Sequence, residues 1–375
     1  FLYGGQYPFV QTGDVKKAGL YLRDFEQTYS EAGLAQSKLW PVGTLCITIA
    51  ANIAETSILD IDACFPDSVI GFVPDPDKAD ARFVKYLFDA VLKMQFQSFT
   101  QGAAQDNLSQ SKLLSIKFSV PDLVVQSRIA DILSAYDDLI ETNRRRIALL
   151  EKAARLLYRE WFVHFRFPGH EHVPLTDGLP EGWKRRRFDE VCDAIGGGTP
   201  KTGKPEFWND GDIPWYTPTD ITRNSCLALL DSATKITEAG LRGSSAKMLP
   251  AGAVLMTSRA SVGFFGIIDT PSSTNQGFIS IVPHDPHARM YLLHNLIHRV
   301  EEIRSHAGGA TYKEISKGKF RALPVVMPRV ALLREFEKQV STLHDQVRVL
   351  HTQNQKLAQA RDLLLPRLMN GEIKV

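Results

Sequence analysis

The sequence has few of the features that identify a membrane or secreted protein. It contains no run of about 18 apolar residues, the length that crosses a bilayer, and no basic stretch followed by an apolar one at its start. Its four cysteines, at positions 46, 64, 192 and 226, include no Cys-x-x-Cys pair. We therefore expect free thiols in a protein of the cytoplasm.

The chain also has little net charge. Its 375 residues carry a formal charge of +2, with 44% hydrophobic and 23% charged residues, which is ordinary for a globular protein. The chain is too long for one typical domain, so two or more are expected. Because the overall charge is small, any surface that binds nucleic acid must be a local concentration of Lys and Arg.

What the sequence does contain is two long heptad patterns, in which apolar residues recur at alternating steps of four and three. This spacing is typical of coiled-coil helices. The first seam consists of Ile129, Leu133, Tyr136, Ile140, Asn143, Ile147, Leu150, Ala154, Leu157 and Trp161. The second consists of Phe336, Val340, Leu343, Val347, Leu350, Asn354, Leu357, Arg361, Leu364 and Leu368. We expect the two helices to pair within the chain.

The polar residues of the seams favour an antiparallel register. If Trp161 lies beside Phe336, then Asn143 lies opposite Asn354, and the two amides share a layer. A parallel pairing would set Asn143 against Leu350 and leave both amides without partners. Each unmade buried hydrogen bond costs about 1 to 3 kcal/mol, so the antiparallel register is preferred.

The same register makes further predictions about the seam. Tyr136 faces Arg361, whose guanidinium can stack on the ring. From Ile129 to Trp161 the seam measures roughly 48 Å at 1.5 Å per residue. A helix pair of this length can hold two domains apart as a spacer.

The rest of the chain is an internal duplication with a period of about 207 residues. The segments 7–15, 41–74 and 102–121 correspond to 213–221, 250–283 and 309–328, and the two seams share the period. Each half is thus predicted to be one globular domain followed by one long helix. Because Phe1 aligns with Phe207 and no initiator Met is present, we expect the first domain to lack about two dozen N-terminal residues of the repeat.

Short strands bounded by Gly and Pro, with one helix in each domain, indicate an α+β fold. The expected helices lie near 79–96 and 286–306. We expect a first domain at 1–121 and a central spacer helix at 122–165. A linker rich in Pro and Gly at 166–182 leads to a second domain at 183–328 and a C-terminal spacer helix at 329–375.

Five short motifs follow one another in the second half. They are Pro180-Glu181-Gly182-Trp183, Gly197-Gly198-Thr199-Pro200-Lys201, Ile213-Pro214-Trp215, Thr219-Asp220-Ile221 and Asn275-Gln276-Gly277. Together with the duplication around two heptad helices, this order resembles the target recognition domains of the specificity (S) subunit of type I restriction-modification systems, the HsdS family. The resemblance covers the whole chain.

The resemblance implies a DNA-reading subunit without an active site or cofactor. Each globular domain would read one half of a split target in double-stranded DNA. The helices would set the distance between the halves and dock two methyltransferase (M) subunits, and endonuclease/translocase (R) subunits would join for cleavage. The alternative from another class is a coiled-coil adaptor that joins proteins and does not bind DNA. The logarithm of a DNA-binding constant falls linearly with the logarithm of the salt concentration, whereas the binding of an adaptor to its protein partners need not do so.

Base readout requires Arg, Lys, Asn, Gln, Ser and Thr on loops, and Lys and Arg also neutralise phosphates. In the second domain the candidates are Lys201, Lys204, Thr217, Thr219, Arg223, Ser258, Arg259, Ser261, Tyr312 and Lys313. In the first domain they are Gln11, Thr12, Lys16, Lys17, Arg23, Asn52 and Gln105. Arg259 is the strongest single candidate, and the alternative for it is a salt bridge to Asp269.

Catalytic alternatives find little support. The sequence has no Asn/Asp-Pro-Pro-Tyr/Phe tetrapeptide of amino-methyltransferases, and the glycines at 196–198 lack the pattern of a phosphate-binding loop. His294 and His298 are four residues apart on an expected helix, but a third ligand is not evident. We therefore expect a packed or surface helix there and no metal site.

Overall fold

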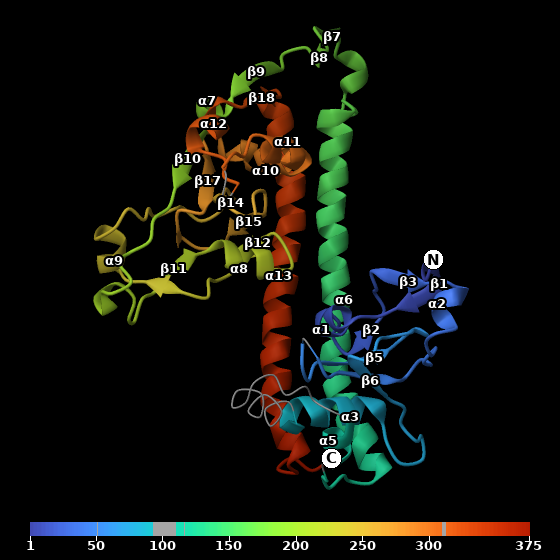
Figure 1. The fold of residues 1–375 in the computed structure, drawn as a ribbon. Helices are drawn as coiled ribbons and strands as arrows, with labels where there is room; N and C mark the ends of the chain where they lie inside the picture. Colours follow the sequence, from blue (N-terminus) through green and yellow to red (C-terminus); the bar gives the residue numbers. More distant parts are fainter. Residues whose placement is uncertain (51, 93–109, 116, 310–312) are drawn as a thin grey trace. The chain divides into compact units, whose positions relative to one another are not determined.

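The computed structural model describes residues 1–50, 52–92, 110–115, 117–309 and 313–375. The chain divides into two compact units. Unit 1 comprises Phe1–Thr142 and Gln353–Val375, and unit 2 comprises Asn143–Thr352. Each unit therefore contains one globular domain and a part of both long helices, and each mixes helices with strands as an α+β fold does (Figure 1).

Unit 1 is built on a four-stranded sheet. The strand order is β2 (Tyr21–Leu22), β5 (Thr56–Leu59), β4 (Leu45–Thr48) and β6 (Val69–Phe72). A hairpin-like pair, β1 (Tyr3–Phe9) and β3 (Gln27–Tyr29), lies outside this sheet. The helices are α1 (Thr12–Lys17), α2 (Glu31–Leu34), α3 (Ala81–Leu87) with the π-helical turn η1 (Phe88–Leu92), and α5 (Gln110–Ser115).

Unit 2 contains the corresponding sheet with one more strand. Its order is β10 (Cys192–Gly196), β17 (Phe278–Pro283), β14 (Val254–Thr257), β15 (Phe265–Ile268) and β12 (Ala228–Leu229). Two smaller sheets are β13 (Lys235–Ile236), β11 (Ile213–Tyr216) and β16 (Ser273–Thr274), and β18 (Pro324–Met327) with β9 (Lys184–Arg187). The helices are α7 (Phe188–Val191), α8 (Pro218–Arg223), α9 (Glu238–Arg242), α10 (Arg289–His298), α11 (Val300–Ser305) and α12 (Lys317–Ala322). The linker forms a 3-10 turn, His170–His172, and the pair β7 (Leu175–Thr176) and β8 (Leu179–Pro180).

The duplication predicted from the sequence is present in the hydrogen bonds. In both sheets the two central strands are antiparallel and the outer two-residue strand is parallel to its neighbour. Gly43, with a φ of 86°, donates its N–H to Leu59, and Gly252, with a φ of 82°, donates to Ile268. Both bonds measure 2.8 Å. The two turns require the left-handed conformation that glycine adopts without strain.

Two long helices run through the chain. α6 spans Leu123–Tyr158 and continues into a π-helical turn at Arg159–Val163, and α13 spans Val330–Met369. Among the described residues, no helix combines the length and the apolar character needed to cross a membrane. The four cysteines are buried free thiols, as expected.

The two helices are antiparallel within each unit, as predicted. In unit 1, Ile129 and Leu368 belong to the same buried cluster. In unit 2, Ile147 shares a cluster with Leu350, and the Trp161 and Phe336 rings lie 5.7 Å apart. All three pairs fit the register that the seam predicts, because a heptad helix turns its apolar residues to one side.

The seam contains two asparagines, Asn143 and Asn354, which were expected to pair. Asn143 and Asn354 are both buried, with exposed fractions of 2% and 9%. The Asn354 side chain donates to the Ile140 carbonyl oxygen at 3.3 Å within unit 1. The expected pairing of the two amides joins residues of different units and stays a prediction.

The expected partner of Arg361 was wrong. Its guanidinium bonds the carboxylates of Asp137 and Asp362, the latter at 2.8 Å, instead of lying on the half-buried ring of Tyr136. Asp137 also accepts a 2.5 Å bond from the Tyr86 hydroxyl. A charged hydrogen bond to a carboxylate is stronger than a contact with a ring face, and the seam pattern alone does not show that Asp137 is within reach.

Candidate nucleic-acid interface

Three motifs of the second domain, those at 197–201, 213–215 and 275–277, lie close to one turn formed by Asn275, Gln276 and Gly277. The Asn275 side-chain oxygen accepts the Gly277 N–H at 2.8 Å, and the Asn275 N–H donates to the Tyr216 carbonyl oxygen at 3.0 Å. The exposed Gln276 side chain accepts the Thr199 hydroxyl at 2.6 Å. Segments that lie far apart in the sequence are thereby fixed side by side.

Two glycines of this region allow its backbones to approach closely. A Cβ atom on Gly197 would lie 2.1 Å from the Thr274 carbonyl oxygen, and one on Gly198 would lie 2.1 Å from the Ser245 hydroxyl. The Gly198 carbonyl oxygen accepts the indole N–H of Trp215 at 2.9 Å. The Gly-Gly-Thr-Pro motif is therefore required for packing, because no larger residue fits at either glycine.

The loop that carries Lys201 and Lys204 follows these glycines. The Trp208 indole N–H donates to the Lys201 carbonyl oxygen at 3.1 Å, which fixes the backbone, while the Lys201 side chain is exposed. The Lys204 ammonium lies 3.5 Å from Glu206 and 4.9 Å from the centre of the Phe207 ring. Lys201 thus presents its charge to solvent, whereas Lys204 shares its charge with Glu206.

Helix α8 carries three more predicted residues. Thr217 is its N-cap, and both its backbone N–H and its hydroxyl donate to the Asp220 carboxylate, at 2.6 and 2.7 Å. Thr217 therefore supports the helix start, as in other capping boxes. Thr219 and Arg223 are exposed on the short helix.

The loop after β14 brings together the predicted residues Ser258, Arg259, Ser261 and Lys313. The Ser258 N–H donates to the Gly277 carbonyl oxygen at 2.8 Å, and Ser258 itself is buried. The Ala260 N–H donates to the Lys313 carbonyl oxygen at 2.9 Å. Ser261 and Lys313 are exposed, so the loop presents polar side chains from two distant segments.

Arg259 does not pair with Asp269, and that alternative was wrong. The Arg259 guanidinium lies 3.9 Å from Glu314, with each side chain about half exposed at 48%. Asp269 instead contacts Arg348 of α13 at 3.3 Å. An exposed ion pair of this kind contributes little to stability.

In the first domain the predicted residues gather on and around α1. Gln11 is the N-cap of this helix and its side chain donates to Gln27 at 3.0 Å, while Thr12 is the first helical residue. The Lys16 ammonium donates to the Asn52 side chain at 3.1 Å, which links the helix to the loop after β4. These four residues form one polar surface.

Two cations of the first domain already have acidic partners. Lys17 lies 2.6 Å from Glu26, and this contact holds the pKa of the exposed Glu26 carboxyl below its usual value. Arg23 bonds Asp60, which holds the Arg23 pKa above its usual value. Gln105 of this domain and Tyr312 of the second lie outside the described residues.

Among the predicted residues of the second domain, three cations have no carboxylate partner within the described ranges: Lys201, Arg223 and Lys313. Unpaired cations need no ion pair to be broken before they contact phosphate, so these three suit backbone contacts. The residues that sequence reasoning missed are Thr199 and Gln276. Their motifs were noted, but only the fold shows that the two side chains meet at the surface.

His294, considered above as a metal ligand, is buried in the core of unit 2. Its ring stacks on Tyr158 at 6.2 Å between centroids, and burial lowers its pKa to about 4. Across the described residues, no three His, Cys, Asp or Glu side chains are grouped to hold a metal ion. His294 is thus a packing residue.

Comparisons with known proteins agree with this arrangement. Residues 1–152 and 180–359 match the family described as Type I restriction modification DNA specificity domain. The chain is 24% identical over 323 residues to the Type I restriction enzyme HindI specificity subunit of Haemophilus influenzae, covering 69% of each chain. It is 29% identical over 170 residues to the MjaIX specificity subunit of Methanocaldococcus jannaschii, covering 45% of this chain and 39% of that one.

The fold is also similar to a solved structure. The crystal structure of the type I restriction-modification S subunit from M. genitalium superposes with a TM-score of 0.58. The superposition covers 98% of this chain and 90% of the other, at 17% sequence identity. At that identity the likeness concerns the fold.

Proposed function

The chain belongs to the family of type I restriction-modification DNA specificity domains, and we propose that it is the subunit that selects the DNA target of such an enzyme. It has no active site of its own in this proposal. The domains at 1–121 and 183–328 each read one half of a bipartite target in double-stranded DNA. The observation that supports this most directly is the duplicated scaffold, which presents two different sets of polar side chains on the same framework.

Readout in the second domain divides between phosphates and bases. Lys201, Arg223 and Lys313 contact phosphates, because their charges are unpaired among the described residues. Arg259 and Ser261 reach base edges from the loop after β14, with Thr219, Lys204, Thr217 and Tyr312 as further candidates. Ser258 is buried and is withdrawn from the predicted contacts. An Arg fork on a guanine is the commonest specific contact of this kind.

The first domain uses a different set on the corresponding elements. Gln11, Thr12, Lys16 and Asn52 form its polar surface, and Lys17, Arg23 and Gln105 are further candidates. Asn52 corresponds to Ser261 in the repeat, so the same loop position carries a different donor and acceptor pattern. The two half-sites should therefore differ in sequence.

The outer sides of the spacer helices dock two M subunits. α6 exposes Ile132, Leu139, Leu149 and Leu156, and α13 exposes Val349 and Leu363, with exposed fractions between 37% and 72%. Large apolar side chains spaced along an exposed helix mark a surface that another protein covers. R subunits join this complex for cleavage, and the complex acts in the cytoplasm, where its DNA is.

The test is to co-express the chain with its methyltransferase subunit in a host without DNA methylation, and to sequence the genome for modified bases. A split motif, two defined blocks around an unspecified spacer, is expected. A motif defined on one side would mean that only one domain reads DNA. A soluble complex that methylates no defined sequence would favour the adaptor, whose partner binding need not fall with salt as DNA binding does.

A further inference from the structure

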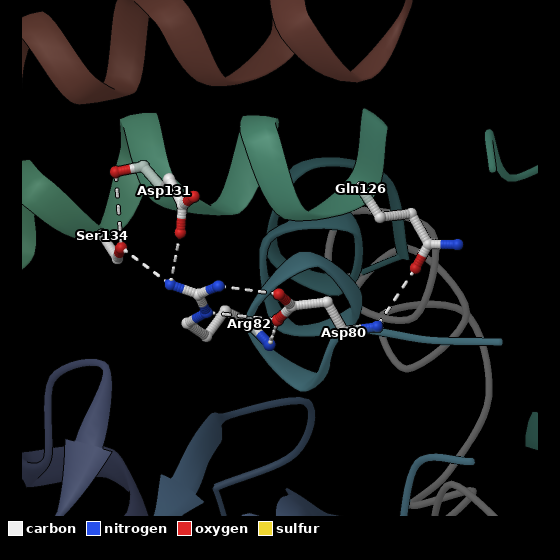
Figure 2. A network of polar contacts seen from close by, with 5 residues as sticks. All are labelled: Asp80, Arg82, Gln126, Asp131 and Ser134. Atoms are coloured by element: carbon white, nitrogen blue, oxygen red, sulfur yellow. Dashed lines mark hydrogen bonds and ion pairs between the residues drawn. The ribbon is translucent and has the colours of Figure 1, made fainter. Parts of the chain in front are cut away.

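Each globular domain is fastened to the spacer helices by an arginine at the start of a helix. In unit 1 this residue is Arg82 of α3. Its Nε and Nη2 donate to both oxygens of Asp80, at 3.2 and 2.7 Å. Its Nη1 reaches α6 and donates to Asp131 at 2.8 Å and to the Ser134 hydroxyl at 3.4 Å (Figure 2). One guanidinium thus links the domain to the spacer.

The corresponding residue of unit 2 makes the same kind of link. Arg289 is the first residue of α10, and its Nε and Nη2 donate to Glu337 of α13 at 3.1 and 2.8 Å. Its Nη2 also donates to the Ser341 hydroxyl at 3.1 Å. Arg82 corresponds to Arg289, and Ser134 to Ser341, at the period that relates the two seams. The link is a repeated feature of the scaffold.

Backbone bonds beside each arginine fix the helix end as well. The Asp80 N–H donates to the Gln126 side chain of α6 at 3.2 Å (Figure 2). Gln126 donates back to the Lys78 carbonyl oxygen at 3.1 Å. The Met290 N–H donates to Glu337 at 2.8 Å. Several bonds in different directions hold both the position and the angle of the helix.

The two arginines are poorly placed to contact DNA. Their side chains are only 27% and 28% exposed, and their guanidinium groups already have carboxylate and hydroxyl partners. A planar guanidinium group that is hydrogen-bonded on two edges fixes the orientation of the groups it joins, whereas a flexible ammonium group does not. Arg82 and Arg289 therefore act on the domain's orientation.

We propose that Arg82 and Arg289 are positioning residues that restrict the protein to one spacer length between the two half-sites. This inference rests on the proposed function. Adding one base pair moves a half-site by about 3.4 Å along the duplex. A globular domain can follow that shift only if its position relative to the spacer helix changes. A shift of this size exceeds the range of a hydrogen bond. We call the contacts that Arg82 and Arg289 make with the spacer helices the clamps. The clamps therefore oppose binding of DNA whose half-sites lie at other spacings.

The test uses the chain in complex with its methyltransferase subunit and a plasmid library. The library carries the two wild-type half-sites at the native spacing and at spacings one and two base pairs shorter and longer. With Arg82→Gln or Arg289→Gln, we expect methylation at the neighbouring spacings to rise about tenfold relative to the native one, equivalent to about 1.4 kcal/mol. The base sequence of each half-site should stay unchanged.

Two further variants keep the test informative. Ser134→Ala and Ser341→Ala each remove one bond of the clamp and should relax the spacing in the same direction, even if an arginine variant fails to fold. Arg242→Gln removes an exposed cation that pairs with Glu238 at 2.7 Å and should leave the spacing preference unchanged. This control matches the charge lost in Arg82→Gln.

Three results would overturn the inference. Clamp variants that methylate only the native spacing, with normal efficiency, would show that the arginines do not set it. A uniform loss at every spacing would indicate a merely structural role. A wild-type complex that methylates no defined target would overturn the proposed function together with the inference, whereas the first two results leave that function standing.

Discussion

Lengthening both spacer helices by one heptad should lengthen the unspecified part of the DNA target by up to about three base pairs. The insertions belong between Thr142 and Asn143 in α6 and between Thr352 and Gln353 in α13, where the two units divide. Seven residues add roughly 10.5 Å at 1.5 Å per residue, and one base pair rises about 3.4 Å. A whole heptad keeps the apolar seam facing its partner within each unit.

The assay is methylome sequencing of cells that express the lengthened chain with its methyltransferase subunit. The half-site sequences should persist while the spacer between them grows. The control is a heptad inserted in α6 alone, which cannot keep both Ile129 beside Leu368 and Trp161 beside Phe336, and should destabilise the fold. A lengthened chain that folds, methylates DNA and keeps the original spacer would refute the idea that the helices measure distance.

Three further predictions concern stability and readout. Trp161→Ala, at a position 5% exposed, should lower the free energy of unfolding by about 3 to 5 kcal/mol in a urea titration. Leu156→Ala, at a position 47% exposed, should change it by less than about 0.5 kcal/mol, and equal effects would contradict the packing account. The His294 pKa of about 4 lies below the unfolded value of about 6.5, so the contribution of His294 to stability should fall as pH drops from 6.5 towards 4, by up to about 1.4 kcal/mol per pH unit. His294→Phe should flatten that slope in urea titrations across this pH range, and an unchanged slope would assign the acid sensitivity elsewhere. Arg259→Ala should relax one base of the second half-site by about 1 to 3 kcal/mol in a binding selection, whereas Lys201→Ala should weaken all sequences alike and reduce the salt slope by about one. If Lys201→Ala altered base preference instead, its phosphate role would be wrong.

The helices and their register could be predicted because they depend on a local period. A heptad pattern fixes which side of a helix is buried, and the buried Trp161 and Phe336 define the end of the seam. The duplication could be found because Gly and Pro punctuate both domains at matching positions. Gly43 and Gly252 are such positions, and their positive φ angles explain the residue type.

Side-chain partners could not be predicted in the same way. The partner of Arg259 is Glu314, which lies on a different loop from the expected Asp269, and only the folded loops decide between two carboxylates. Arg361 likewise prefers Asp137 to the ring of Tyr136. Such choices depend on atomic distances of a few ångström, which neither periodicity nor residue type contains.

The residues of the clamps can be found by comparing the two repeats, although the amino-acid composition does not indicate them. Arg82 and Arg289 look like any other surface arginines, yet they occupy equivalent positions of the repeat, as do Ser134 and Ser341. An identity between two domains that we propose to read different sequences points to the shared framework. Positions that differ between the domains, such as Asn52 and Ser261, point to readout.

The loops after β4 and β14 show how framework and readout are separated. In both, a threonine hydroxyl closes the loop: Thr48 accepts the Glu55 N–H at 2.9 Å, and Thr257 accepts the Phe264 N–H at 2.9 Å. Each hydroxyl also donates to a carbonyl oxygen at the loop tip, that of Asn52 or Ser261. Because these bonds use the backbone at the tip, the side chain there can change without disturbing the loop. Changes at the loop tips should therefore alter which bases are read, while changes at the clamps should alter the spacing between the two half-sites. The two properties can evolve independently on one duplicated scaffold.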